Sequence, residues 1–224
     1  MDDKGITKRT LMKQLEDLSG ILEKMKKSEA PYKRLFEAAR LIAAAVETRD
    51  PCKAGHQLRV ADLSRAIAEE MNLPARQVQG LHMAGIIHDI GTISIPVSLI
   101  NKPTNYTEKE FQKMVKHAES GHDLLKKIDF PWPVARIILE HHERINGSGY
   151  PRGLRGKDLL PESRILAVAD VVDALSSDRP HRPALGIDAA LYDIAGNRGV
   201  LFDPDAVDAC IRLFREKHYK MIDD

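Results

Sequence analysis

The sequence predicts an all-α domain, a bundle of helices preceded by a helical arm. Three observations support this fold class. Apolar residues recur at helical spacing along most of the 224-residue chain. Caps, prolines and glycines separate these stretches as helix starts and stops do. No stretch shows the alternation of apolar and polar residues that a half-buried strand would have.

The composition excludes two classes of partner. Apolar residues make up 43% of the chain, charged residues 30%, and the net charge is +1. We therefore expect no binding to a nucleic acid polymer or to an anionic membrane. No apolar run approaches the ~20 residues of a membrane-spanning helix, and the N-terminus has no signal-peptide character. Two cysteines make no disulfide framework, so we expect a cytoplasmic protein.

Residues 1–30 are the expected arm, and residues 31–224 are the expected domain. Apolar residues at spacings of four and three predict a helix over residues 7–29, with the seam Leu11, Leu15, Leu18, Leu22 and Met25. The seam lasts about two and a half heptads, which is short for a coiled coil. Two interpretations stay open: a helix packed on its own domain, or an arm that forms a homodimer or carries a signal.

The first half of the domain should contain helices over residues 32–48, 56–71 and 76–89. The second of these carries an apolar face made of Val60, Leu63, Ile67 and Met71. Residues 92–106 are expected to form an irregular loop. Thr107 and Glu110 then form a capping box, and the helix that they start carries Phe111, Met114, Val115 and His117.

The second half should begin with a helix over residues 134–143, followed by a Gly- and Pro-rich surface loop over residues 144–161. Pro161 opens an apolar helix over residues 163–175, and a basic turn follows at residues 178–182. Asp203 as N-cap and Pro204 at the first helical position predict the last helix. Its expected inward stripe is Val207, Cys210, Ile211, Phe214 and His218.

Seven ionisable residues are candidate metal ligands, since a buried charge must be paired or bind a metal. They are His56, His88, Asp89, His117, His141, His142 and Asp170. Imidazole and carboxylate suit iron, manganese, zinc and other catalytic divalent metals. The other helical histidines, His82, His122 and His218, are expected to be surface or core residues.

Two metal ions are expected rather than one. Neighbouring helix positions diverge by ~100°, so His141 and His142 can reach two metals, or one metal and a substrate. Asp89 follows a ligand histidine and is the natural bridge. Two metals about 3.5–4 Å apart stabilise the attacking and leaving oxygens of phosphoester hydrolysis, and they lower the pKa of a bridging water.

Asp173 lies one turn after Asp170 on the same helix face. We expect Asp170 to be a metal ligand and Asp173 to orient a histidine or an arginine. The alternative for Asp173 is a salt bridge to an arginine such as Arg164.

A series of motifs in this order closely resembles the HD-GYP family, a branch of the HD phosphohydrolase superfamily. The motifs are His88-Asp89-Ile90-Gly91, His141-His142-Glu143-Arg144, Gly147-Ser148-Gly149-Tyr150-Pro151, residues 164–170 and residues 173–180. The resemblance covers residues 38–215. It implies a helical bundle around two or three metals, often iron or manganese, that hydrolyses cyclic di-GMP to linear pGpG or on to GMP.

The resemblance also implies roles for single residues. The seven candidate ligands match the metal ligands of the family by position. Asp89, Arg144 and Tyr150 are expected to act in catalysis. Substrate contacts are expected from Thr92, Tyr150, Arg179 and Arg182, because guanidinium forks suit phosphate and the guanine edge.

Departures from the family pattern qualify these expectations. Thr92 stands where a lysine usually contacts a substrate phosphate, so slower turnover or another substrate preference is expected. Asn146 and His181 stand where aspartate and tyrosine are common. Cys52 replaces the glutamate of members with three metals; it is expected to be a packed thiol, with a thiolate ligand as the alternative. We therefore expect two divalent ions, iron or manganese first, with zinc, nickel, magnesium and calcium as alternatives.

The leading hypothesis is a cyclic-dinucleotide phosphodiesterase, in which a metal-bridging hydroxide attacks the scissile phosphate and the 3′ oxygen leaves. Two alternatives remain. Thr92 favours a receptor that binds cyclic di-GMP without useful turnover and signals through the arm. The third hypothesis keeps the chemistry but changes the substrate to a related ring such as cyclic GMP-AMP.

Overall fold

A computed structural model describes residues 31–50, 53–178 and 182–222. Within these ranges the chain is helical, and pairing of the β type is limited to two isolated bridges, Asn146–Arg155 and Arg198–Phe202. The predicted all-α fold is confirmed. The predicted arm, Cys52, Arg179 and His181 lie outside the described residues.

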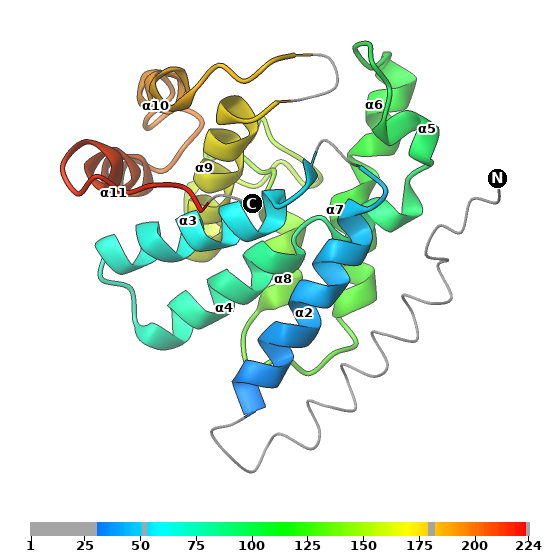
Figure 1. Cartoon of the computed structure of the whole chain (residues 1–224), viewed down its shortest axis with the longest axis horizontal. Helices are drawn as coiled ribbons and strands as arrows, with labels where there is room; N and C mark the ends of the chain where they lie inside the picture. Colours follow the sequence, from blue (N-terminus) through cyan, green and yellow to red (C-terminus); the bar gives the residue numbers. More distant parts are fainter. Residues whose placement is uncertain (1–30, 51–52, 179–181, 223–224) are drawn as a thin grey trace.

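The centre of the fold is a layer of helices that pack on α3 (His56–Glu70). Helix α4 (Ala75–Ile87) lies along α3, and α2 (Pro31–Glu47) packs on α4. Helix α9 (Pro161–Ser176) crosses behind α3, as Figure 1 shows. Helix α3 therefore packs against both α4 and α9, while α2 is held through α4.

Two further pairs complete the molecule on opposite sides (Figure 1). Helices α7 (Lys116–Leu125) and α8 (Val134–Glu140) pack together on one side, with α5 (Val97–Ile100) and α6 (Glu108–Met114) beyond them. On the other side α10 (Ile187–Gly196) packs on α9, and α11 (Pro204–Arg215) packs on α3. In the described ranges, no helix is both long and apolar enough to cross a membrane.

Large aliphatic side chains fill the space between these helices. Each fully buried leucine or isoleucine contributes roughly 1.5–3 kcal/mol to stability. The predicted inward face of α3 is confirmed for Val60, Leu63 and Ile67, which have no exposed surface. Other fully buried residues are Leu35, Leu81, Met83, Ile86, Ile87, Ile90, Leu125 and Ile137. This core holds the helix ends that carry the candidate ligands.

The segment expected to be an irregular loop is more regular than predicted. A 3₁₀ turn, η2 (Ile90–Ser94), and the short helix α5 occupy part of it. The capping box of Thr107 and Glu110 is confirmed. The helix that it starts ends at Met114, however, and α7 begins two residues later. At this break the Met114 carbonyl lies 2.7 Å from His117 Nδ1, so a side chain replaces the usual backbone donor.

Two predictions for the C-terminal part need correction. Helix α10 was not predicted, because it begins after Gly186 without a side-chain cap. The last helix begins as predicted, with the Asp203 carboxylate accepting the N–H groups of Asp205 and Ala206. Placing His218 on its inward stripe was wrong. The helix ends at Arg215, and His218 is exposed with a φ of 53°.

Candidate metal centre

Helix ends bring the candidate ligands together. His56 is the first residue of α3, and His117 lies in the first turn of α7. His88 and His141 are the C-caps of α4 and α8, and each is followed by a second candidate ligand. Asp170 comes from the middle of α9, where the core packing of that helix directs it inward.

Six of the seven candidate ligands form two groups of three. The potential ligand atoms of His56, His88 and Asp170 lie within 4.8 Å of one another. Those of His117, His141 and His142 form the second group by the same measure. His141 and His142 therefore share one group rather than dividing between the two.

Asp89 lies between the groups. Its Oδ2 atom is 3.9 Å from Nε2 of His56 and 3.9 Å from Nε2 of His88. Its Oδ1 atom is 3.7 Å from Nε2 of His117 in the other group. One carboxylate thus faces both sets of histidines, one oxygen to each.

Asp170 also spans the two groups. Its Oδ1 atom lies 3.4 Å from His56 Nε2, and its Oδ2 atom lies 3.8 Å from His142 Nδ1. From the sequence, Asp170 was expected to be a ligand of one metal and Asp89 to be the bridge between two. In the structure each of the two carboxylates lies close enough to both groups of histidines to bind a cation in each.

Backbone carbonyls orient three of the rings. The Nδ1 atoms of His88, His117 and His141 lie 2.6–2.7 Å from carbonyl oxygens three residues earlier in the chain. Nδ1 must donate in such a contact, so the lone pair is on Nε2, which faces the centre. This is how metal-binding histidines are usually held.

His56 is oriented by a side chain instead. Its Nδ1 atom is 2.6 Å from Asp173 Oδ2, and Asp173 Oδ1 accepts a hydrogen bond from Arg59 Nε at 2.6 Å. Asp173 thus contacts both a histidine and an arginine. The alternative partner, Arg164, pairs with Asp203.

Glu47, which the sequence argument did not select, helps to place His56. Its carboxylate accepts the N–H groups of Gly55 and Gln57, both at 3.0 Å, and so caps the N-terminus of α3. The cap comes from the end of α2, eight residues before Gly55. No pattern in the sequence marks a cap from such a distance.

The chemistry of the site fits divalent cations. Nε2 of His56 and Nε2 of His88 are buried and have no hydrogen-bond partner among the described residues, although leaving such an atom unpaired costs about 1–3 kcal/mol. Burial lowers the pKa of His56 and His117, and it lowers the pKa of His141 to about 3. These imidazoles are therefore neutral, the form that binds a metal.

Asp89 keeps its charge although it is buried. Burial favours the neutral acid, but the charge of the Lys53 ammonium holds the pKa of Asp89 well below its usual range. Lys53 Nζ lies 2.6 Å from Asp89 Oδ2. Lys53 carries no motif signal and was missed from the sequence.

Lys53 also lines a cavity of about 220 Å³ beside the centre, together with His56, Asp89, Thr92 and Tyr106. The hydroxyl of Thr92 donates to the Asp89 carbonyl at 2.8 Å. The Thr92 hydroxyl therefore makes its hydrogen bond within the 3₁₀ turn. Two cationic side chains line this cavity, Lys53 beside Asp89 and Arg49, which donates to the Thr92 and Ile95 carbonyls.

The Gly147–Pro151 loop covers the second group of histidines. The Tyr150 ring lies 4.8 Å from the His142 ring and 6.4 Å from the His117 ring, measured between centroids. The buried Glu143 carboxylate accepts the N–H groups of Arg152 at 2.6 Å and Leu154 at 3.1 Å. These two hydrogen bonds hold the residues that directly follow the loop.

The candidate arginines differ in position. The Arg144 guanidinium lies over the Phe202 ring, 5.1 Å from its centroid, and donates to the Glu143 carbonyl. Arg182 donates to the carbonyls of Ala174 at 2.6 Å and Pro183 at 2.9 Å, near the end of α9. Arg179 lies outside the described residues.

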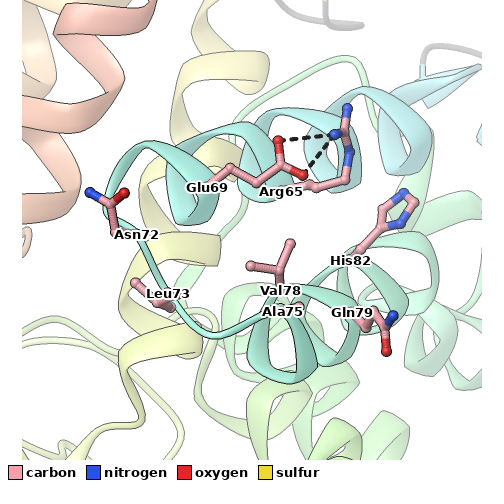
Figure 2. Close-up of a pocket in the computed structure, with 8 residues that line it drawn as sticks. All are labelled: Arg65, Glu69, Asn72, Leu73, Ala75, Val78, Gln79 and His82. Carbon is pink, nitrogen blue, oxygen red and sulfur yellow. Dashed lines mark hydrogen bonds and ion pairs between the residues drawn. The ribbon is translucent and has the colours of Figure 1, made fainter.

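A second cavity, of about 500 Å³, lies between α3 and α4 and has none of the seven candidate ligands in its lining. Figure 2 shows Arg65 and Glu69 paired on α3, with Val78 and His82 of α4 on the opposite wall. The His82 ring stacks on Phe36 at 5.1 Å. His82 is thus a packed histidine, as expected.

Comparison with known families agrees with this geometry. Residues 40–206 match the HD domain family. The chain belongs to this family. All seven candidate ligands of this HD domain fall within the matched span, and the expected resemblance to the HD-GYP branch is confirmed.

Curated relatives of this HD domain carry related names. It is 43% identical over 173 residues to a cyclic di-GMP phosphodiesterase response regulator of Xanthomonas campestris, covering 76% of this chain and 46% of the relative. It is 38% identical to a cyclic di-GMP phosphodiesterase of Thermotoga maritima, covering 81% and 50%. It is 34% identical to 3′3′-cGAMP-specific phosphodiesterase 3 of Vibrio cholerae, covering 71% and 35%. The chain spans half the length of these relatives or less.

Solved structures share the fold. An HD-GYP-type protein from Bdellovibrio bacteriovorus superposes with a TM-score of 0.63 at 20% identity, covering 96% of this chain and 75% of that one. A cyclic GMP-AMP-specific phosphodiesterase from V. cholerae gives a TM-score of 0.62 at 20% identity, covering 80% and 49%. The HD-type helical fold is thereby confirmed.

Proposed function

We propose that this HD domain is a metal-dependent phosphodiesterase that opens cyclic di-GMP to linear pGpG or on to GMP. The observation that carries the proposal is the position of Asp89, with one oxygen toward His56 and His88 and the other toward His117. A carboxylate shared by two groups of imidazoles suits a pair of divalent cations. The names of the relatives support the choice of substrate.

Two ions are proposed, with Asp89 and Asp170 shared between them. His56 and His88 would hold one ion, and His117, His141 and His142 would hold the other. When bound, divalent metals polarise phosphate oxygens and lower the pKa of water, so that it becomes a nucleophile at neutral pH. Iron and manganese are the proposed metals, with zinc, nickel, magnesium and calcium as alternatives.

The other residues of the site bind, orient and exclude water. Burial raises the pKa of Tyr150, so its phenol stays protonated and can donate a hydrogen bond to a phosphate oxygen. Arg144, Arg179 and Arg182 are proposed to balance the charge of the substrate. Asp173 keeps the Nδ1 proton of His56 in place, which leaves Nε2 to the metal.

Product and metal analysis together test the proposal. The reduced protein, loaded with iron or manganese, should convert cyclic di-GMP to a linear product. His88→Ala and Asp89→Ala should abolish turnover and remove most of the metal found by elemental analysis. His122→Ala is the matched control, because this half-exposed histidine pairs with Asp123. Unchanged metal content in both site variants would contradict their assignment as ligands.

A second substrate is proposed because relatives named 3′3′-cGAMP-specific phosphodiesterases are 31–34% identical to this chain. Rates measured on cyclic di-GMP and on cyclic GMP-AMP with the same metal-loaded sample distinguish the two candidate substrates. The ratio of the two kcat/KM values identifies the preferred ring.

The Thr92 hydroxyl, turned to the Asp89 carbonyl, favours the receptor as the remaining alternative. Tight binding of cyclic di-GMP without product would support a receptor, and Thr92→Lys would then be expected to restore turnover. Product formation by the unmodified chain would exclude it. The homodimer through residues 1–30 stays a prediction, which sedimentation of the chain with and without that segment can test.

A further inference from the structure

Helix α6 stands at the rim of the metal centre and has no buried residue. Its N-terminus is held by the capping box of Thr107 and Glu110 rather than by core packing. It nevertheless carries a large aromatic side chain, Phe111, which is 42% exposed. Core packing therefore does not account for a phenylalanine at this position.

Within the part of the chain that the structure describes, the Phe111 ring contacts one other ring, that of Tyr150, which lies at the site. The two rings meet edge-on, with 5.9 Å between centroids and 88° between planes. The Tyr150 ring lies in turn 4.8 Å from the His142 ring. Three rings thus form a row from the surface to the second group of histidines. An edge-to-face contact of this kind also holds the Phe111 ring in one orientation.

We propose that Phe111 stacks on a purine base of the cyclic dinucleotide, an inference that rests on the proposed function. When a phosphate lies at the metal centre, the attached sugar and base extend outward from it. The row of rings extends outward over the same side, and its outermost ring has an exposed surface. Aromatic side chains bind purines by stacking on their faces.

The charge of the rim is consistent with this assignment. The helix that carries Phe111 has Glu108 and Glu110 in its first turn and Lys113 in its last, so it has no excess of positive charge. Glu110 is bonded to Lys102 and Thr107. An apolar ring is therefore the feature of α6 directed at Tyr150. A base, being uncharged, suits that surface better than a phosphate does.

A structural role predicts a different result. If Phe111 only supports the Tyr150 loop, a leucine of similar size should replace it, and its loss should lower kcat. If Phe111 stacks on a base, only an aromatic residue should replace it, and its loss should weaken binding with little change in kcat. The comparison of Phe111→Leu with Phe111→Trp separates the two roles.

The experiment measures the Kd of cyclic di-GMP by calorimetry, and kcat and KM, on the full metal-loaded chain. Phe111→Ala and Phe111→Leu should each raise Kd and KM about 5- to 100-fold. Their kcat values should stay within about twofold, because stacking binds ground state and transition state alike. Phe111→Trp should keep the wild-type Kd, and the fluorescence of the introduced tryptophan should change on binding.

Tyr192→Ala is the control, since Tyr192 is 84% exposed on α10, across the molecule from α6 (Figure 1). It should leave Kd, KM and kcat unchanged. An unchanged Kd in Phe111→Ala, or full function in Phe111→Leu, would overturn the inference. Absence of product with the wild-type chain would count against the proposed function alone, because the Kd measurement still reports on Phe111.

Discussion

Gly91 and His117 are in backbone contact. A Cβ atom built on Gly91 would lie 1.9 Å from the His117 carbonyl oxygen and 2.5 Å from the Gly121 nitrogen. The 3₁₀ turn after Asp89 and the first turn of α7 therefore touch without an intervening side chain. This contact sets the distance between Asp89 and the His117 ring, and hence between the two groups of ligands.

Gly91→Ala should separate these two segments. No nearby side chain can move aside, because the clash is with backbone, so the variant should lose about 1–3 kcal/mol of stability. Metal binding in the His117 group should weaken, and turnover should fall about 100-fold, as expected for a misplacement near 1 Å. Gly196→Ala is the control, because a Cβ there meets no atom within 4 Å. Denaturant unfolding, elemental analysis and turnover measure the effects.

Asp173→Asn should weaken metal binding without removing a ligand. The amide keeps the size of the side chain but loses the charge that orients His56 and pairs with Arg59. Loss of such an outer partner typically costs 10- to 100-fold in metal affinity. Competition with a chelator measures this affinity. Asp208→Asn, which disrupts the surface ion pair with Arg198, should leave it unchanged.

Metal removal should lower the melting temperature. Candidate ligands come from α3, α7 and α9 and from the C-terminal ends of α4 and α8, so bound metal would add a further link between these helices. A ligand present at 1,000 times its Kd stabilises a fold by about 4 kcal/mol. Thermal unfolding with metal, with chelator and after reloading measures this linkage. Identical melting temperatures in all three samples would contradict a metal centre in this position.

The metal-free protein should lose stability between pH 6.5 and pH 4, and His82 should contribute to the loss. Burial, helped by the charges of Arg65 and Arg40, lowers the pKa of His82 to about 4 in the folded state, against about 6.5 in the unfolded chain. The unfolded state therefore binds more protons over this range, and unfolding becomes easier as the pH falls.

His82→Phe, which keeps a ring against Phe36, should reduce this loss by roughly 1–3 kcal/mol. Denaturant unfolding of both proteins at pH 7 and pH 4, with chelator present, gives the difference. The histidines of the centre are the same in both proteins, so their contribution cancels in the comparison. An equal loss in wild type and variant would show that His82 is not buried as described.

Local patterns predicted most of the helices. Prolines, caps and 3.6-residue periodicity act over a few residues, which is why α3 and α9 were expected close to their observed bounds and α11 at its observed start. Helix α10 has no such start signal and was missed. The break at Val115 was missed for a related reason, since it accompanies the packing of α7 against η2 and α8 rather than any local residue.

The sequence by itself determined which residues are candidate ligands, because an ionisable side chain in an apolar stretch is conspicuous without any structure. It did not determine how the ligands divide into two groups, or that Asp170 lies close to both groups. Only the tertiary structure decided these, and only it placed Lys53 beside Asp89 and Glu47 on the N-terminus of α3. The reason is physical. Such contacts join helix ends that are far apart in the chain, and their distances follow from how the core packs rather than from any local pattern.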